Sequence, residues 1–326
     1  MAVRTFWWVT FFLPVFFFAC QPKDTKVTTK DTPISGELTI AVDESLSPLI
    51  DAEMATFQGI YSEAHITAKY LTENEVINAF LSDSLRQVII TRPLTTKEIQ
   101  YFASQKRQVT TTKIAIDAIA LIVNNTNADT VLTYQQLLSI MRGEIHHWSQ
   151  LNTGSQASGI NVVFDNSNSS TVRLLKDSLA QVNKLPANCF AVNSNPKVID
   201  YVSSHANSMG LIGVSWISDR DDSLTMSFLN KIKVVSISNS KAEKEKIEFY
   251  KPFQAEMKLK QYPLCRNIYV ISSESWAGLG SGFASFLASD RGQRIVQKSG
   301  LLPATMPVRI IQLGDDSRFK QQMQQE

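Results

Sequence analysis

The chain has 326 residues, of which 44% are hydrophobic and 19% are charged, and its formal net charge is +2. This is the composition of an ordinary soluble protein, and because a single core seldom grows beyond about 250 to 300 residues, we expect two domains. The small net charge excludes a strongly basic surface of the kind that binds nucleic acid.

The first 20 residues form a separate segment. After Arg4, an apolar run covers residues 6–19 and ends in an alanine followed by Cys20. The run is shorter than the roughly 20 residues that span a bilayer. A small residue before a cysteine is typical of bacterial lipoprotein signal peptides, which residues 1–20 resemble. We therefore expect export and lipidation of Cys20, with the polar residues 21–35 as a flexible tether; the alternative is a plain secretory signal with an incidental cysteine.

Strand and helix patterns alternate over the next part of the chain. Apolar strands are predicted at 36–42, 66–71 and 88–90. This alternation predicts a largely parallel sheet, in which ligands bind at the carboxyl ends of the strands. Ser45 follows the first strand, and Thr91 and Arg92 follow the third, so we expect these three side chains near a ligand.

Helix boundaries are marked by local signals in two places. Residues 72–75 have the Thr-x-x-Glu spacing of a capping box, and a helix is predicted over 133–143, from Thr133 to a terminal glycine. Between them, residues 113–125 are too apolar for a solvent-facing strand and predict a strand within the core. The adjacent pair His146 and His147 has no further ligands at metal-site spacing, so we expect no metal and no cofactor.

The stretch 162–179 predicts a strand, a polar loop and a helix. Either Ser169 or Asn168 can cap this helix, and Ser170 and Thr171 then lie in its first turn. Unpaired backbone N–H groups, hydroxyls and the positive end of the helix dipole together predict a site for a small anion.

Arg173 is unfavourable at this position, because the first turn of a helix prefers acidic side chains. Its partner is either a bound anion, which would add Arg173 to the site, or the carboxylate of Asp165 upstream. The residues leave both alternatives open.

The remaining segments complete an alternating α/β pattern. We predict a helix over 195–203, strands over 209–216, 231–237 and 262–271, a solvated excursion over 241–251, and a final helix over 283–296. The glycine-rich residues 278–282 lack the lysine and spacing of a nucleotide site and predict a turn. Cys189 and Cys265 are expected to be free, buried thiols.

Several of these segments, taken in order, resemble the extracytoplasmic phosphate-binding proteins of ABC phosphate importers. The similar segments are 116–124, 132–133 with 143–145 and Trp148, 199–202, 209–213, 262–264 with Arg266, and 300–303. Together they cover most of the mature chain.

The resemblance implies a two-lobed periplasmic-binding-protein fold of type II, with two mixed sheets flanked by helices and a two-strand hinge. It implies one lobe over 36–117 and 262–313, a second lobe over 118–261, and a polar C-terminal tail over 314–326, with crossover strands near Ile116 and Tyr269. We expect a monomer whose lobes close on the ligand.

The resemblance also implies a phosphate site in the cleft. Ser45 matches the hydroxyl after the first strand, Thr91 matches a polar position, and residues 169–171 match a Ser-Gly-Thr motif. Two departures matter: Asp165 stands where the family often has an arginine, and residues 72–75 bring carboxylates near the site. Arg92 and Arg173 are candidates to replace the positive charge of that arginine. The alternatives are that the ligand preference has moved from phosphate to another oxyanion, or that it has been lost.

The function implied is capture of phosphate or a related oxyanion for an ABC permease, by a protein held at the cell envelope through the lipid on Cys20. The alternative is a sensing or surface-interaction lipoprotein that keeps the fold without a permease. A hydrolase using Ser169 or Ser170 is disfavoured, because the sequence shows no nucleophile elbow and only four histidines. We therefore expect no enzymatic activity.

Overall fold

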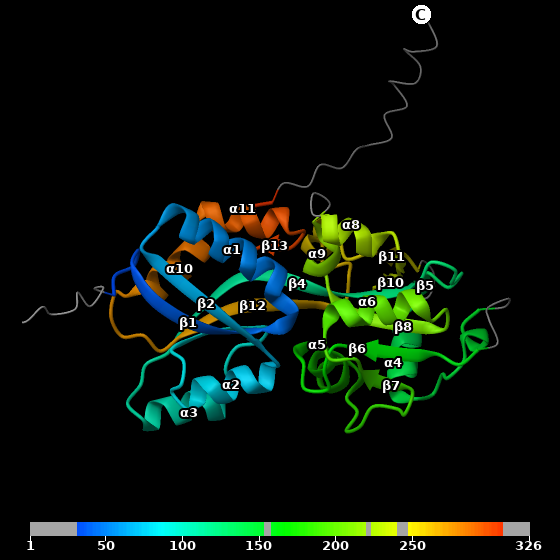
Figure 1. The fold of residues 1–326 in the computed structure, drawn as a ribbon. Helices are drawn as coiled ribbons and strands as arrows, with labels where there is room; N and C mark the ends of the chain where they lie inside the picture. Colours follow the sequence, from blue (N-terminus) through cyan, green and yellow to red (C-terminus); the bar gives the residue numbers. More distant parts are fainter. Residues whose placement is uncertain (1–30, 153–157, 220–222, 240–246, 309–326) are drawn as a thin grey trace, which may run out of the picture.

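A computed structural model of the chain describes residues 31–152, 158–219, 223–239 and 247–308. The expected signal peptide with Cys20, most of the tether and the tail 314–326 lie outside these residues. Strand β4 (Thr110–Asn124) has 15 residues and passes through both halves of the molecule (Figure 1). Each half is built on one end of this strand.

The first half of β4 belongs to the sheet of lobe 1, in the order β2-β1-β3-β12-β4. β1 pairs in parallel with β2 and β3, whereas β12 lies antiparallel to β3 and β4, and β13 also pairs with β4. Figure 1 shows α1, α10 and α11 on one side of this sheet and α2 and α3 on the other. The elements are β1 (Gly36–Asp43), α1 (Ser47–Ile60), β2 (Ala64–Leu71), α2 (Glu73–Leu81), β3 (Gln87–Ile90), α3 (Thr96–Ser104), β12 (Cys265–Ser272), α10 (Leu279–Ala288), α11 (Asp290–Lys298) and β13 (Leu302–Pro303).

The second half of β4 pairs antiparallel with β8 and β9, and β6 lies parallel between β8 and β7. A small separate sheet contains β5, β10 and β11. The elements of lobe 2 are β5 (Val131–Leu132), α4 (Tyr134–Arg142), β6 (Asn161–Phe164), α5 (Ser170–Arg173), β7 (Cys189–Ala191), α6 (Asn195–Ser204), β8 (Ser208–Gly213), α7 (Ser215–Ser218), α8 (Ser223–Leu229), β9 (Ile232–Val234), β10 (Ser236–Ser238), β11 (Phe249–Tyr250) and α9 (Gln254–Lys258). The predicted two-lobed α/β fold with mixed sheets is confirmed.

The helix signals read from the sequence are confirmed. Thr72 and Glu75 form the capping box that begins α2. The Thr133 hydroxyl accepts the backbone N–H of Gln136 at 3.1 Å at the start of α4. The same helix ends at Gly143, whose φ of 75° lies in the left-handed region that favours glycine.

The single helix predicted over 283–296 is wrong. The chain forms α10 and α11 instead, separated by Ser289 in an extended conformation, with its hydroxyl capping α11. The glycine-rich residues 278–282 are likewise not a free turn, because they enter the first turn of α10. Gly282 lies so close to the backbone of Pro33 that a Cβ atom there would meet the Pro33 oxygen at 1.8 Å. This contact is with a distant part of the chain, and the local pattern does not reveal it.

Two strand predictions also need correction. Residues 231–237 form not one strand but two, β9 and β10, which belong to different sheets. Within the described residues, β12 pairs only with β3 and the first half of β4, so Tyr269 does not lie at a crossover. The chain returns to lobe 1 at 262–264, where the carbonyl oxygen of Leu264 accepts the N–H of Ile119 at 2.9 Å.

Candidate functional site

Ser45 lies two residues after the end of β1, in the short turn that leads into α1. Its hydroxyl donates to the Asp43 carboxylate at 2.5 Å, and its backbone N–H donates to the same oxygen at 3.0 Å. Ser45 is completely buried and Asp43 is 1% exposed. The end of β1 thus presents a fixed hydroxyl with a carboxylate behind it.

The guanidinium group of Arg266 joins the two lobes at this hydroxyl. Its Nη2 donates to Ser45 Oγ at 2.9 Å, and its Nη1 donates to Ser170 Oγ at 2.7 Å. Its Nε donates to Asp117 at 2.8 Å, because the two residues are directly opposite each other in the β4–β12 pairing. Arg266 is 5% exposed and Asp117 is fully buried. A buried cation therefore lies between predicted site residues from both lobes.

The helix of lobe 2 begins as predicted. Ser169 caps it by accepting the N–H of Val172 at 3.3 Å. It is α-helical over Ser170–Arg173 and continues as a π-helix to Ala180. Ser170 and Thr171 are fully buried, and the Thr171 hydroxyl has no hydrogen-bond partner among the described residues.

Arg173 does not pair with Asp165 but contacts lobe 1. Its Nε donates to Glu73 of lobe 1 at 2.5 Å, and its Nη2 donates to the Thr91 hydroxyl at 3.0 Å. Arg92 also approaches Glu73, at 3.3 Å, and forms a closer pair with Glu98 at 2.8 Å. Glu73 is 1% exposed, so two arginines and one threonine hydroxyl surround a buried carboxylate.

This arrangement corrects the alternative in which Asp165 is the partner of Arg173, whereas anion binding by Arg173 or Arg92 stays a prediction. Neither arginine pairs with Asp165, and both charges are compensated by carboxylates of lobe 1. The structure brings Ser45 and Ser170 together, with their hydroxyl oxygens 3.4 Å apart, and gathers Thr91, Arg92 and Arg173 around Glu73 instead. Among residues 72–75, Glu73 is the carboxylate near the site.

A third group of polar side chains spans the lobes beside Arg266. The Asn195 side-chain amide donates to Glu44 at 3.2 Å and to Asp165 at 3.5 Å. The pKa of Glu44 is raised to about 7, first by burial and then by the nearby negative charge of Asp165. Burial also raises the pKa of Asp165 to about 6, against hydrogen bonds from Ser169 and the backbone of Asn166.

The residues that sequence reasoning missed are Arg266 as a site residue and its partner Asp117. It also missed Asp43, which holds Ser45, and Asn195, which contacts Glu44 and Asp165. One signal was available. Asp117 and Arg266 each interrupt an apolar strand, and a charged residue inside a strand core needs an opposite charge. That the two charges face each other depends on a pairing between distant strands, which the sequence does not show.

Other expectations concern residues outside this site. Cys189 and Cys265 are free, as predicted, but each is half-buried rather than fully buried. Burial raises the pKa of each thiol to about 12, which keeps it protonated at neutral pH. In the described part of the chain, no three His, Cys, Asp or Glu side chains are grouped as metal ligands. No helix there is long and apolar enough to cross a bilayer.

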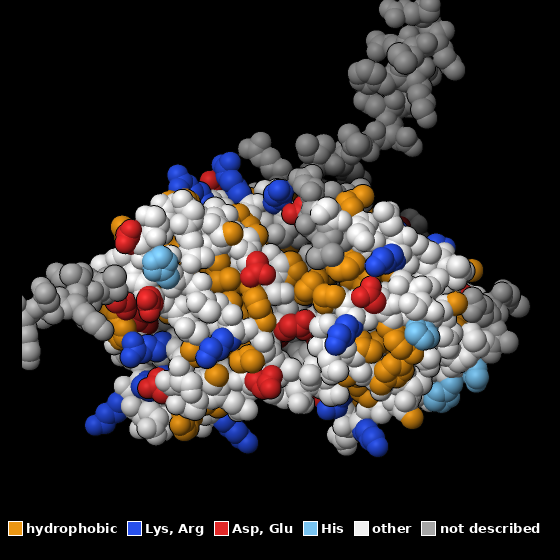
Figure 2. Space-filling model, in the orientation of Figure 1, with side chains coloured by type: hydrophobic (Ala, Val, Ile, Leu, Met, Phe, Trp, Pro, Cys, Tyr) orange, Lys and Arg blue, Asp and Glu red, His pale blue; other side chains and the backbone are white. Residues whose placement is uncertain are grey.

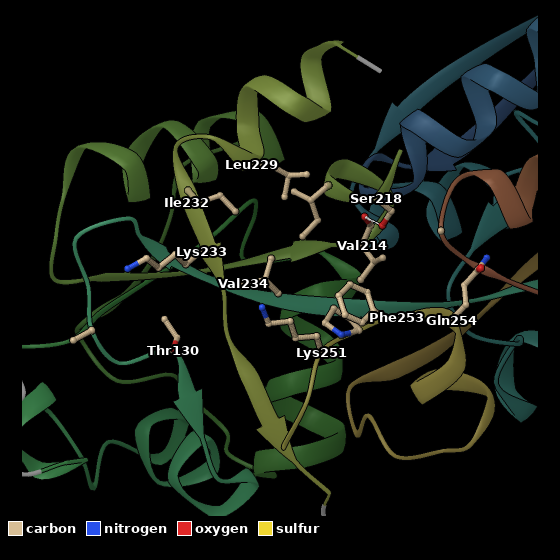
Figure 3. A pocket seen from close by; sticks show the side chains of 14 residues that line it. Thr130, Val214, Ser218, Leu229, Ile232, Lys233, Val234, Lys251, Phe253 and Gln254 are labelled. Carbon is tan, nitrogen blue, oxygen red and sulfur yellow. Dashed lines mark hydrogen bonds between the residues drawn. The ribbon is translucent and has the colours of Figure 1, made fainter. Parts of the chain in front are cut away.

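A cavity of about 740 Å³ lies elsewhere, lined mostly by residues of lobe 2 (Figure 3). Apolar side chains such as Val214, Leu229 and Phe253 line it, together with Lys233 and Lys251. None of the predicted site residues contributes to it. On the face in Figure 2, the described acidic and basic side chains are interspersed, without a continuous basic patch.

The comparisons with known proteins agree with this fold. A family described as a PBP superfamily domain matches residues 27–291. The phosphate-binding protein PstS of Borreliella burgdorferi is 24% identical over 275 residues, covering 81% of this chain and 89% of the relative. PstS of Pseudomonas aeruginosa strain PAO1 is also 24% identical, covering 84% of this chain and 85% of the relative.

Solved structures give the same result. An ABC-type phosphate transport receptor from Vibrio cholerae superposes with a TM-score of 0.61 at 21% identity, covering 82% of this chain and all of that one. A phosphate-binding protein from Stenotrophomonas maltophilia gives 0.59 at 14% identity, covering 83% of this chain and 91% of that one. These proteins are described as binding proteins or receptors and not as enzymes. At such identities the likeness concerns the fold, and the match over residues 27–291 shows that the chain belongs to the PBP superfamily.

Proposed function

We propose that the chain captures inorganic phosphate, or a related oxyanion, between its two lobes for import by an ABC transporter. The observation that carries this proposal is the buried guanidinium of Arg266, which contacts a serine hydroxyl of each lobe. A cation with hydroxyl donors on both sides is suited to an anion that has several acceptor oxygens. Phosphate is proposed as the ligand because the relatives are phosphate-binding proteins.

The chemistry of capture follows from the donors at this position. Oxygens of the anion accept hydrogen bonds from Arg266, Ser45 and Ser170, in place of the direct contacts between these side chains. Thr171 supplies a further hydroxyl, which has no partner among the described residues. Because these hydroxyls are buried, the lobes must part to admit the anion and close again around it.

Calorimetric titration with phosphate, arsenate and sulfate tests the proposed site. Ser45→Ala and Ser170→Ala each remove one hydrogen bond to a charged ligand, worth about 1.5 to 3 kcal/mol, so phosphate affinity falls at least about tenfold. Ser285→Ala, an exposed serine of α10, serves as the matched control and leaves affinity unchanged. Wild-type protein that takes up none of the three anions would refute the proposal.

We also propose that a lipid on Cys20 anchors the protein to the cell envelope, where it meets a permease. The support is the apolar run that ends at Cys20 and the polar tether that follows. Stable anchoring needs more than one acyl chain, as a lipidated N-terminal cysteine provides. Cys20→Ser moves the protein from the membrane to the soluble fraction, and unchanged partitioning contradicts the anchor.

A further inference from the structure

Two carboxylates from different lobes approach one another beside the Arg266 site. Glu44 follows β1 in lobe 1, and Asp165 follows β6 in lobe 2. Nδ2 of Asn195 lies 3.2 Å from Glu44 Oε2 and 3.5 Å from Asp165 Oδ2, and the backbone N–H of Asn195 lies 3.4 Å from Glu44 Oε1. A single amide group therefore holds both carboxylates at the junction of the lobes.

The charges around this pair compensate it only in part. Asp43 adds a further negative charge next to both carboxylates. The positive charge of Arg266 lowers the pKa of Asp165, but Arg266 is already bound to Asp117 through its Nε. Among the described residues, no lysine, arginine or histidine forms an ion pair with Glu44 or Asp165. Two ionised carboxylates at this position would repel each other across the lobe boundary.

Two buried acceptor oxygens beside this pair of carboxylates have no hydrogen-bond donor in the described residues. Asp165 Oδ1 and Asn195 Oδ1 have no hydrogen-bond donor in the described part of the chain, although these residues are only 1% and 0% exposed. A buried acceptor without a donor is costly, and an ionised one is more so. A hydrogen bound to either carboxylate removes one negative charge and becomes a donor.

We propose that Glu44 and Asp165 form a proton-binding site between the closed lobes, so that capture of an anion takes up a proton. Closure brings the carboxylates together, and a bound anion adds negative charge beside them. Both events favour the protonated pair. The coupling to an anion rests on the proposed function, whereas the proton site itself does not.

The raised pKa values, about 7 for Glu44 and about 6 for Asp165, set the pH range. A carboxyl group whose pKa is raised in the folded state stabilises that state fully at low pH, below its ordinary pKa. This stabilisation is lost as the pH rises through the raised value. The closed form should therefore lose stability between about pH 5 and pH 8.

Thermal melting of the free protein tests the proton site without any ligand. Glu44→Gln keeps the size of the side chain and removes its titration, so its Tm falls less than that of wild type between pH 5.5 and pH 8, by about 2 to 4 °C. Asp165→Asn makes the same change from lobe 2. Glu37→Gln, an exposed position at the start of β1, follows wild type. If both site variants also follow wild type, the proton site is refuted.

Titration with inorganic phosphate at pH 7.5, in buffers of different ionisation enthalpy, tests the coupling. Wild type takes up more protons per phosphate than Glu44→Gln, and the titration of phosphate itself cancels in this comparison. Equal uptake by the two proteins contradicts the coupling. If wild type binds no phosphate, the coupling to phosphate fails and the proposed function then depends on arsenate and sulfate, while the melting curves still decide the proton site.

Discussion

At the scale of single residues, charged side chains from distant parts of the chain hold the lobes against one another. Glu73 of lobe 1 accepts hydrogen bonds from Arg173 of lobe 2, and Arg266 of lobe 1 donates to Ser170 of lobe 2. Both contacts are largely shielded from solvent, so they are less screened than surface ion pairs. Parting of the lobes would require that these contacts break.

Arg173→Ala removes one of these contacts. We expect the free energy of unfolding to fall by about 1.5 kcal/mol, the lower end for a hydrogen bond to a charged group, because Arg92 still approaches Glu73. The control is Arg294→Ala, whose exposed pair with Asp290 within α11 is worth about 0.3 to 0.5 kcal/mol. Urea unfolding of both variants measures the difference. Equal losses in the free energy of unfolding would show that the contact between the lobes stabilises the protein no more than an exposed ion pair does.

Glu53 gives a second prediction at this scale. It is fully buried in α1, and neither of its carboxylate oxygens has a partner among the described residues. Burial raises its pKa to about 9. Because the folded pKa is raised, the stability that this group supports is full below its ordinary pKa and is lost as the pH rises toward 9.

We therefore expect wild type to lose stability with rising pH more steeply than Glu53→Gln, by at most about 1.4 kcal/mol per pH unit. Chemical unfolding at pH 5, 7 and 8.5 measures these slopes. The exposed Glu63→Gln variant is the control and keeps the slope of wild type. Identical slopes for Glu53→Gln and wild type would mean that Glu53 is ionised in the folded protein.

Single residues were predictable from the sequence where their role depends on near neighbours. Ser169 caps its helix through Val172, three positions along the chain. The partner of Arg173 is Glu73, 100 positions away, and that of Arg266 is Asp117, 149 positions away. Such pairs depend on how strands and lobes come together, so local preferences suggest only that a partner is needed.

At the scale of elements, helix ends are fixed by backbone geometry that side chains must fit. Gly143 ends α4 with a φ of 75°, and a Cβ there would lie 3.1 Å from Cγ of Pro186. Gly59 lies in α1, where a Cβ would meet nothing within 4 Å. The same substitution should therefore have opposite effects at the two positions.

Gly143→Ala is expected to lower the free energy of unfolding by about 1 to 2 kcal/mol, because alanine is strained in the left-handed region. Gly59→Ala is expected to raise it by about 0.5 to 1 kcal/mol, because alanine restricts the unfolded chain and favours the helix. Thermal melting distinguishes them by the sign of the shift in Tm. Shifts of the same sign would contradict the assigned end of α4.

Elements with strong local signals, such as α2 and α4, were predicted with their caps. The division between α10 and α11 was not, because Ser289 breaks the helix within a pattern that stays amphipathic on both sides. Nor was the crossover at 262–264, since an apolar strand pattern gives no information about which lobe it joins. In both cases the deciding contacts come from elsewhere in the fold.

At the scale of the whole molecule, β4 carries both sheets, and the lobes meet at hydroxyls, carboxylates and one buried arginine. This arrangement accounts for why the sequence resemblance identified the fold while the site residues were only partly foreseen. The fold follows from strand patterns that run through the chain. The site forms only where the lobes meet. There, the acidic residues Glu44, Glu73 and Asp165 place carboxylates close to the proposed anion site.

The proposed site places an oxyanion between Ser45 and Ser170, at Arg266. A crystal structure of the protein grown with arsenate tests it most directly, because the anomalous signal of arsenic locates the anion. We expect one strong peak within hydrogen-bond reach of the Arg266 guanidinium and both serine hydroxyls. A peak at another position would contradict the proposed site. So would a structure at a saturating concentration of arsenate in which Arg266 still contacts both serines as it does without the anion.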